Sequence, residues 1–351
     1  MMNKLWNNLQ KKIIVIALAS LLILSCAQRI YDVAYPTLND GQYDSEFPYR
    51  NCSKQLEEIS ASVKLINCMA FYESYIFSKE EMVVKADILQ KILNYDKEIL
   101  YDHHPVSGTA TIISKAFDKV LILTCAHIVD FPDTLYAFYQ NDANEPKYLQ
   151  SVAVLSNIDL YINDIPNGDK LEILATDYPN DIALLGVDIG RAQNFIPVFD
   201  YPIGSSHELE WGSFVYILGY PIGNKMITRG IVSNPGNAEK STFLIDALFN
   251  KGFSGGLVLA IRDGVPNFEL VGIAQSVSAE YNYILVPDKE RYEYNYNLQL
   301  PYTGKSRVAL KEEINYGITH AISIEAIQSF IKENKRELES KGYRTNNFLK
   351  K

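Results

Sequence analysis

A serine among glycines is the first feature of this sequence that could do chemistry. Residues 252–256 are Gly-Phe-Ser-Gly-Gly, and glycines let the backbone turn tightly enough for successive amide N–H groups to point into one concavity. Ser254 could then attack a carbonyl carbon while the N–H groups of Gly252 and Ser254 bind the developing oxyanion. Each such donor typically changes the rate by roughly 10²–10³-fold. The alternative is a plain glycine-rich turn.

A histidine at the end of an apolar stretch could supply the general base. Residues 121–127 are Leu-Ile-Leu-Thr-Cys-Ala-His, and this pattern predicts a strand that ends at the imidazole of His127. A general base must be held by packing and still reach the nucleophile, and the end of a strand suits both needs. A lone histidine can equally be structural, so the motif needs support from elsewhere in the chain.

An aspartate directly before a second apolar stretch could orient that histidine. Residues 180–185 are Asn-Asp-Ile-Ala-Leu-Leu, so Asp181 is drawn toward the core by the strand that follows it. Burial of a carboxylate is costly unless it is paired. A histidine N–H is a natural partner, because the carboxylate fixes the tautomer and stabilises the imidazolium. The alternative is an aspartate that caps a turn.

The three motifs follow one another in the order histidine, aspartate, serine. This is the chain order of the chymotrypsin arrangement, and it differs from the orders of the subtilisin and α/β-hydrolase arrangements. We therefore predict that His127, Asp181 and Ser254 form a catalytic triad, although they lie far apart along the chain.

The elements that must position these residues are mostly short strands. Apolar stretches separated by Gly, Pro, Asn and Asp predict an all-β sandwich or barrel, with strands at residues 109–113, 120–124, 152–155, 181–187, 214–219 and 270–274. Upstream, the sequence predicts a strand over 62–77. The capping-box pattern Ser-Lys-Glu-Glu then predicts a helix over about 79–95. A helical spacing of apolar residues returns from Ile324 to Ile331.

Taken in order, the motifs resemble those of the trypsin-like serine peptidases, and within them the bacterial HtrA (Deg) branch, over about residues 105–331. The similar segments lie at residues 107–110, 123–129, 180–185, 211–215, 218–223, 228–233, 246–256 and 317–322. The resemblance implies a mainly β, chymotrypsin-like fold of two six-stranded antiparallel β-barrels with the triad in the cleft between them. An N-terminal helical insertion and a C-terminal helix would accompany the barrels.

The resemblance also implies roles for single residues. His127 would be the general base, Asp181 its orienting carboxylate and Ser254 the nucleophile, with the N–H groups of Gly252 and Ser254 as the oxyanion hole. The reaction would be acylation of Ser254 by a peptide carbonyl, followed by hydrolysis. No metal or cofactor is implied.

Departures from the family pattern cluster near the serine. Phe253 stands where relatives carry Asn or Asp, and Leu257 replaces the usual proline, so the geometry of the oxyanion loop could differ. In the fold that the resemblance implies, the residue six before the nucleophile often forms the floor of the primary pocket, so Leu248 is expected to give an apolar floor, with Gln275 as a second pocket residue. Only 29 residues follow Ile322, too few for a PDZ domain.

A polar, tyrosine-rich insert at residues 279–316 lies between the last predicted barrel strands. Its length is unusual for a connection in a compact domain, and such loops tend to be functional or mobile. We predict that it shapes substrate access, and a solvated surface loop is the alternative.

The N-terminus has the pattern of an export signal. A basic stretch precedes an apolar run from Ile13 to Leu24, which is too short for a comfortable membrane span of about 20 residues and fits a secretory signal. Residues 23–26, Ile-Leu-Ser-Cys, resemble a bacterial lipobox, so Cys26 is the predicted lipidation site. An uncleaved anchor with an incidental cysteine is the alternative. The protein is therefore expected to be an exported lipoprotein of the periplasm or cell surface.

The predicted organisation covers the whole chain: a signal peptide at 1–25, a tether at 26–50, a strand and helical extension at 51–104, a protease domain at 105–335 and a polar tail at 336–351. The two barrels are predicted at about 105–200 and 205–335.

Charge and cysteine content limit the possible partners. The net charge of −9 repels phosphate backbones and argues against a nucleic-acid partner. The resemblance implies a polypeptide substrate, and the lipobox-like residues predict a membrane as the second partner. Export would permit a Cys52–Cys68 disulfide, whereas Cys125 lies in an apolar run and is predicted to be buried. Two rival functions remain: an inactive, peptide-binding protease fold, and an esterase that uses the same triad.

Overall fold

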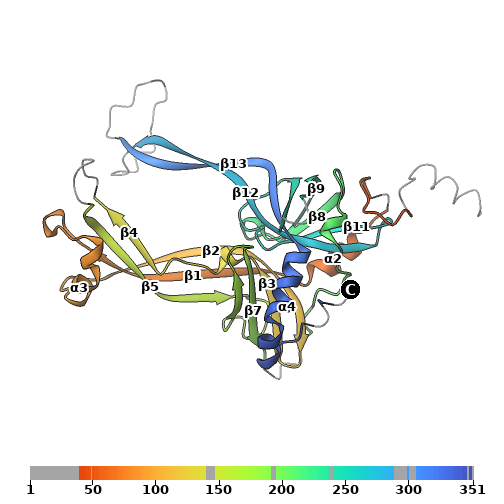
Figure 1. The fold of residues 1–351 in the computed structure, drawn as a ribbon, viewed down its shortest axis with the longest axis horizontal. Helices are drawn as coiled ribbons and strands as arrows, with labels where there is room; N and C mark the ends of the chain where they lie inside the picture. Colours follow the sequence, from red (N-terminus) through yellow and green to blue (C-terminus); the bar gives the residue numbers. More distant parts are fainter. Residues whose placement is uncertain are drawn as a thin grey trace, which may run out of the picture.

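Antiparallel strands form nearly all of the structure that positions these residues (Figure 1). The computed structural model describes residues 39–48, 50–139, 147–190, 195–236, 241–287, 299, 306–345 and 348–349. Its strands fall into two systems, which we call the first and second halves.

The first half is a seven-stranded sheet in the order β4-β5-β1-β2-β3-β7-β6. Its strands are β1 (Val63–Ile76), β2 (Leu100–Ala116), β3 (Lys119–Thr124), β4 (Thr134–Phe138), β5 (Leu149–Tyr161), β6 (Glu172–Asp177) and β7 (Ile182–Asp188). The second half is a closed barrel in the order β10-β13-β12-β11-β8-β9. Its strands are β8 (Phe214–Gly219), β9 (Met226–Asn234), β10 (Thr242–Ala247), β11 (Leu257–Ile261), β12 (Phe268–Pro287) and β13 (Ser306–Ser323).

Helices are few among the described residues: α2 (Ser53–Ser60), α3 (Ile88–Leu93), α4 (Ile324–Ser340) and several single 3₁₀ turns. Ser323 is the N-cap of α4, and its side chain accepts a hydrogen bond from the Ala326 N–H at 3.2 Å. Within the described ranges, no helix is both long and apolar enough to span a membrane.

The core explains the unbroken apolar runs of the sequence. β3 and β7 are neighbours in the first sheet and are buried along almost their whole length, because both of their faces are covered. Ile327 and Ile331 of α4 belong to this same core, which continues into the second half through residues such as Leu257. The two halves therefore share a hydrophobic core.

Two arms extend from the body on the same side (Figure 1). One is built from the outer parts of β1, β2, β4 and β5 and carries α3. The other is the long hairpin of β12 and β13, whose paired residues run from Gly272–Ser323 to Pro287–Ser306. The insert predicted at residues 279–316 falls within this hairpin.

The predicted fold class is confirmed: the chain is mainly β, with a closed six-stranded barrel and a C-terminal helix, in agreement with a chymotrypsin-like double barrel. The first half differs in detail, because it is a seven-stranded half-barrel sheet. Its edge strands β4 and β6 lie at opposite ends of the strand order and do not pair. All six strands predicted from Thr109 onward are present, and so is the strand over 62–77, which is β1.

The helix predicted over 79–95 is wrong over most of its length. Ser78 and Glu81 do form a capping box, but the turn stops at Met82, which has a left-handed φ of 47°. The next residue, Val83, is buried, and its carbonyl accepts a hydrogen bond from the N–H of Leu149 at 2.8 Å. Tertiary pairing thus replaces the helix with 3₁₀ turns, and α3 keeps only residues 88–93.

Three further expectations need adjustment. β1 lies in the middle of the first sheet, between β2 and β5, and the predicted boundary at residue 105 falls inside β2. Part of the expected tether is packed on the second half, where Tyr43 is buried and its hydroxyl donates to Glu269 at 2.7 Å. The described cysteines are free thiols, so the Cys52–Cys68 disulfide is not formed.

Candidate active site

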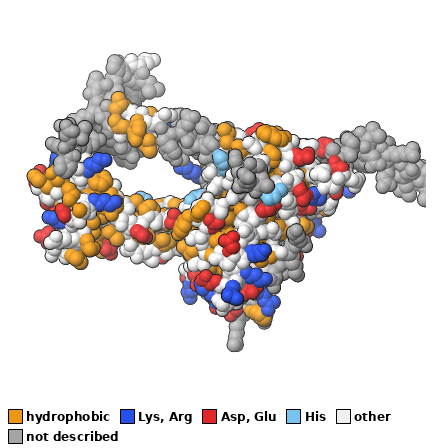
Figure 2. Space-filling model, in the orientation of Figure 1, with side chains coloured by type: hydrophobic (Ala, Val, Ile, Leu, Met, Phe, Trp, Pro, Cys, Tyr) orange, Lys and Arg blue, Asp and Glu red, His pale blue; other side chains and the backbone are white. Residues whose placement is uncertain are grey.

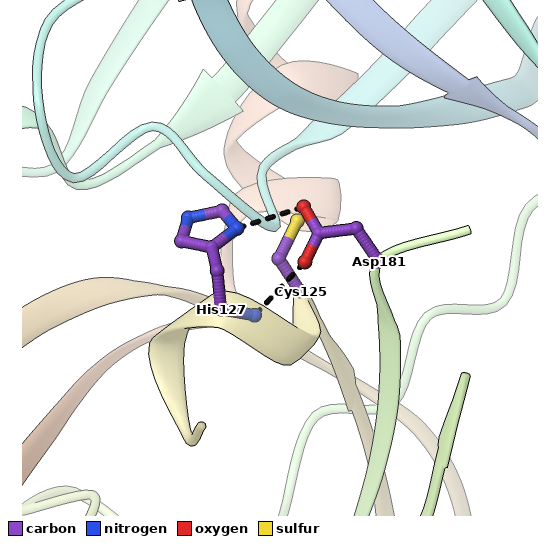
Figure 3. A group of neighbouring side chains, drawn as sticks. All are labelled: Cys125, His127 and Asp181. Atoms are coloured by element: carbon purple, nitrogen blue, oxygen red, sulfur yellow. Dashed lines mark hydrogen bonds and ion pairs between the residues drawn. The ribbon is translucent and has the colours of Figure 1, made fainter. Parts of the chain in front are cut away.

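His127 and Asp181 meet because their strands are neighbours. β3 ends at Thr124 and β7 begins at Ile182, and the antiparallel register pairs Thr124 with Ala183. The end of one strand therefore lies beside the start of the other. The chain beyond β3 forms a 3₁₀ turn over Ala126–Ile128, which turns the imidazole of His127 toward Asp181 (Figure 3).

The Asp181 carboxylate holds this histidine at two points (Figure 3). One oxygen lies 2.7 Å from Nδ1 of His127, and the other accepts the backbone N–H of His127 at 2.8 Å. The carbonyl of Asp181 also accepts the N–H of Ala126 at 3.1 Å. The carboxylate side chain is only 14% exposed and the imidazole 45% exposed, so a shielded acid fixes a base whose Nε2 remains available.

Asp181 adopts a left-handed backbone conformation, with φ of 59°. Asp tolerates this region better than most residues, but such a conformation is still strained and persists only where its surroundings enforce it. The N–H of Asp181 donates to the carbonyl of Tyr178 at 3.2 Å, which closes the turn before β7. The strained turn aims the carboxylate at His127.

Ser254 lies in the loop between β10 and β11. We call residues 250–256 the nucleophile loop. Five consecutive carbonyls of this loop, from Asn250 to Ser254, each accept a hydrogen bond. The donors are the N–H of Phe253 (3.1 Å), the N–H of Ile222 (2.9 Å), the hydroxyl of Thr109 (2.6 Å), the N–H of Gly256 (2.7 Å) and the N–H of Thr109 (2.8 Å), in that order.

These bonds orient the remaining N–H groups. A trans peptide is planar, so its N–H points away from its carbonyl. The carbonyls of Lys251 and Phe253 are hydrogen-bonded to the N–H groups of Ile222 and Gly256, so the N–H groups of Gly252 and Ser254 point away from these contacts. Within the described structure, neither of these two N–H groups donates to another residue. Gly252 has a φ of 105°, which only glycine adopts readily. The two N–H groups are those that the sequence assigned to the oxyanion hole.

The nucleophile loop and the histidine turn are joined through Ala274 of β12. Its carbonyl accepts the N–H of Gly255 at 2.8 Å and also the thiol of Cys125 at 3.5 Å. Cys125 lies two residues before His127, so one carbonyl contacts segments adjacent to both Ser254 and His127. In the described structure no hydrogen bond joins the Ser254 hydroxyl to His127, and in unliganded enzymes such contacts are often long until substrate binds.

The two unusual residues of the loop are core residues. Phe253 is 2% exposed and packs on Phe249, with ring centroids 5.7 Å apart. Leu257 is fully buried at the start of β11. A Cβ on Gly219 would lie 2.9 Å from the Phe253 ring, so the barrel leaves space for this side chain. Phe253 therefore anchors the nucleophile loop by apolar packing.

The predicted pocket residues are not enclosed. Leu248 is 68% exposed, so it does not form a buried apolar floor, and that prediction needs correction. The reason is the alternation of β10 and the segment that follows it, which buries Ala247 and Phe249 and turns Leu248 outward. Gln275 is half-buried, next to Ala274 at the register shift of β12.

Cys125, His127 and Asp181 also form a group whose potential ligand atoms lie within 4.8 Å of one another (Figure 3). Metal binding would require the thiolate, whereas burial raises the pKa of the Cys125 thiol well above its usual value. A metal would also have to displace the contact between Nδ1 and the carboxylate. The donor set therefore suits an acid–base pair better than a metal site.

Sequence reasoning missed the contribution of Thr109 and Ala274 to this site. Both act through hydrogen bonds to backbone groups, and no residue type or spacing in the sequence identifies such a contact in advance.

Residues 108–273 match the family model of the trypsin-like peptidase domain. The matched range contains His127, Asp181 and Ser254, and it supports a trypsin-like serine peptidase. No curated protein matches the chain.

Proposed function

We propose that this trypsin-like domain is an active serine endopeptidase of the HtrA-like branch, in which His127, Asp181 and Ser254 cleave polypeptides. The observation that carries the proposal is the two-point contact between Asp181 and His127. Its strongest support is the nucleophile loop, whose Gly252 and Ser254 N–H groups have no acceptor in the described structure.

The geometry suits acyl transfer. The Asp181 carboxylate is hydrogen-bonded to Nδ1 of His127, which leaves Nε2 as the base. Nε2 takes the hydroxyl proton of Ser254 as the Ser254 oxygen bonds to the substrate carbonyl carbon. The resulting oxyanion accepts the N–H groups of Gly252 and Ser254. The C–N bond then breaks, and His127 gives its proton to the leaving amine. Water attacks the acyl-enzyme, its proton passes to His127, and the acid product leaves with Ser254 restored.

The decisive test is labelling by a fluorophosphonate probe, which reacts with activated serines. We expect the wild type to be labelled and to cleave an unfolded protein substrate, and Ser254→Ala to lose both properties. Labelling retained in Ser254→Ala would remove Ser254 as the nucleophile. A folded wild type that takes no label and cleaves no peptide would favour a peptide-binding protein, and turnover of esters without peptides would favour an esterase.

The β12–β13 arm supports a proposal about substrate. Beyond Ile273, β12 is paired on one side only among the described strands, with β13. Its other edge therefore offers free backbone groups, and an extended polypeptide can pair with such an edge. The edge starts beside Ala274, which contacts the nucleophile loop.

The same arm carries exposed apolar side chains (Figure 2). Tyr283 faces Leu310 and Leu285 faces Val308 across the two strands, and each of the four is more than half exposed. In this view an open gap separates the arm from that of β1, β2, β4 and β5. We propose that an unfolded polypeptide with apolar side chains lies along this arm as it enters the site. The insert's other tyrosines, such as Tyr292 and Tyr294, lie outside the described residues.

We further propose that a lipid on Cys26 anchors the protein to a bacterial cell envelope. The support is the lipobox-like sequence alone, because Cys26 lies outside the described residues. Mass spectrometry of the mature N-terminus should find a lipidated cysteine in the wild type and none in Cys26→Ala. An unmodified Cys26 in membrane-extracted protein would contradict the anchor while leaving the peptidase proposal intact.

A further inference from the structure

Thr109 of β2 is a buried polar residue at the point where the two halves meet. It is completely buried, and its backbone and side chain contact segments that lie far from it in the sequence. We infer that the Thr109 hydroxyl is a positioning group that holds the nucleophile loop in its reactive shape. The inference rests on the proposed peptidase function and names a residue beyond the triad on which that function depends.

The contacts of the Thr109 hydroxyl leave it no freedom. Its oxygen accepts the backbone N–H of Tyr220 at 2.8 Å. Its single proton goes to the carbonyl of Gly252 at 2.6 Å. Since an amide N–H can only donate and a carbonyl can only accept, the direction of both bonds is fixed.

The bond to Gly252 acts on a peptide that shapes the oxyanion hole, whereas the bond from Tyr220 fixes the direction of the hydroxyl. The carbonyl of Gly252 belongs to the peptide between Gly252 and Phe253, which lies between the two N–H donors of the hole. The backbone N–H of Thr109 also binds the carbonyl of Ser254 at 2.8 Å. Thr109 therefore holds the loop on both sides of the Ser254 N–H.

Thr109 also connects the loop to the strand of the base. Its carbonyl accepts the hydroxyl of Thr124 at 2.8 Å, and Thr124 is the last residue of β3, three residues before His127. A single residue thus contacts the segment that carries the base and the loop that carries the nucleophile.

Two glycines pack closely against Thr109. A Cβ on Gly219 would lie 2.7 Å from its hydroxyl oxygen, and a Cβ on Gly255 only 2.0 Å from its carbonyl oxygen. Glycines therefore lie on two sides of Thr109, and their lack of a side chain lets the nucleophile loop approach closely enough to form the hydrogen bonds with Thr109. A misplacement of about 1 Å at a reacting group can lower a rate roughly 100-fold.

The chain supplies a matched control on the same strand. Thr111 lies two residues along β2 and is equally buried, but its hydroxyl has no hydrogen-bond partner among the described residues. Thr109→Val removes a hydroxyl that makes two bonds, and Thr111→Val removes one that makes none. The two isosteric changes therefore separate loop positioning from a general effect on β2.

The experiment compares wild type, Thr109→Val, Thr109→Ser and Thr111→Val in the full-length protein. With an unfolded protein as substrate, we expect Thr109→Val to lower kcat roughly 10- to 100-fold while KM changes less than about twofold. Thr109→Ser should recover most of kcat because it keeps the hydroxyl, and Thr111→Val should match the wild type. Hydrogen exchange at the Phe253 amide, which belongs to the same peptide as the Gly252 carbonyl, should become faster in Thr109→Val only.

Each outcome decides one of the two claims. If Ser254→Ala is inactive but Thr109→Val keeps the kcat of Thr111→Val, the positioning role is overturned and the peptidase stands. If the wild type shows no activity, the peptidase proposal fails, and exchange at the Phe253 amide still decides whether Thr109 holds the loop. Unchanged exchange in a folded Thr109→Val protein overturns that role.

Discussion

The two halves of the molecule hold their candidate catalytic residues in different ways. In the first half, His127 and Asp181 follow from the pairing of β3 with β7, and they contact each other directly. In the second half, Ser254 lies in a loop without regular structure, and the shape of that loop depends on donors from outside it, including Thr109 of the first half. The acid–base pair is thus a product of one sheet, whereas the nucleophile requires both halves to be docked.

Substitutions in the two halves should therefore differ in their effects on catalysis and on stability. A substitution of His127 or Asp181 should remove catalysis and leave the fold intact, because these side chains lie at strand ends and that of His127 is nearly half exposed. A change at the nucleophile loop should affect stability as well, because Phe253 anchors the loop in the core of the second half.

Asp181→Asn should have the largest effect on catalysis. An amide at this position can leave the imidazole in the wrong tautomer, and the loss in kcat should be roughly 10³–10⁴-fold. The melting temperature should change little. Steady-state kinetics and thermal unfolding measure both. Asp188→Asn, at the other end of β7 in a surface ion pair with Lys119, is the control and should keep kcat within about twofold. An Asp181→Asn protein with near-normal kcat would show that the pair is only structural.

Phe253→Ala should damage the second half in two ways. Removal of a buried phenylalanine typically costs about 3–5 kcal/mol of unfolding free energy, and here it also releases the anchor of the nucleophile loop. We expect kcat to fall more than tenfold even at temperatures well below unfolding. Phe268→Ala, at an equally buried position on β12, is the matched control. It should lose comparable stability in denaturant titrations and keep its kcat.

Equal kcat losses in the two phenylalanine variants would mean that stability alone controls activity, and the proposed anchor would then be wrong. Equal retention of kcat would contradict it as well.

The β12–β13 arm extends the comparison to substrate binding. Tyr283→Ser combined with Leu285→Ser should raise KM for a long unfolded polypeptide at least tenfold, since one fully buried apolar side chain contributes roughly 1.5–3 kcal/mol and about 1.4 kcal/mol is a factor of ten. KM for a short peptide that occupies only the cleft should not change. Phe117→Ser, at an exposed turn of the first half, is the control. Equal KM values for the long substrate in all three proteins would remove the arm from substrate binding.

The sequence could predict what depends on local patterns. Continuous apolar runs identified β3, β7 and β8 because these strands are buried on both faces. The order of three short motifs placed His127 beside Asp181, because strand ends carry the two residues. The same motifs supplied the two free N–H groups of the nucleophile loop.

Features that depend on distant partners could not be predicted in this way. The helix over 79–95 failed because Val83 pairs with Leu149, far along the chain. Leu248 was expected to be enclosed, but its exposure is set by the burial of its neighbours. The docking of Tyr43 on Glu269 and the bonds of Thr109 also join residues that no periodicity relates.

The segment around Asp44 is hydrogen-bonded to the second half. Asp44 donates its N–H to Ile261, accepts the N–H of Phe214 on its carbonyl, and accepts the N–H of Gly264 on its carboxylate at 3.0 Å. Burial raises the pKa of this carboxyl to about 6, despite the hydrogen bond from Gly264.

The sign of the pH effect follows from this shift. The unfolded carboxyl titrates near about 3.9, so between about pH 4 and pH 6 the folded state binds more protons than the unfolded state. Folding stability should therefore fall as pH rises through this window and stay at the lower level above it. Asp44→Asn has no such proton to lose. Its melting temperature should exceed that of the wild type by a few degrees at pH 7.5, and the difference should shrink toward pH 4.

Calorimetry from pH 4 to pH 8 measures this difference, with Asp87→Asn, an exposed position of the first half, as the control. The kcat of Asp44→Asn at 25 °C should equal that of the wild type, because the hydrogen bonds of Asp44 go to Ile261, Phe214 and Gly264, which lie outside the acid–base pair and the nucleophile loop. Parallel melting curves for Asp44→Asn and the wild type across the whole range would show that the buried carboxyl does not strain the second half. Any pH dependence of the unfolding free energy would then come from titratable groups other than Asp44.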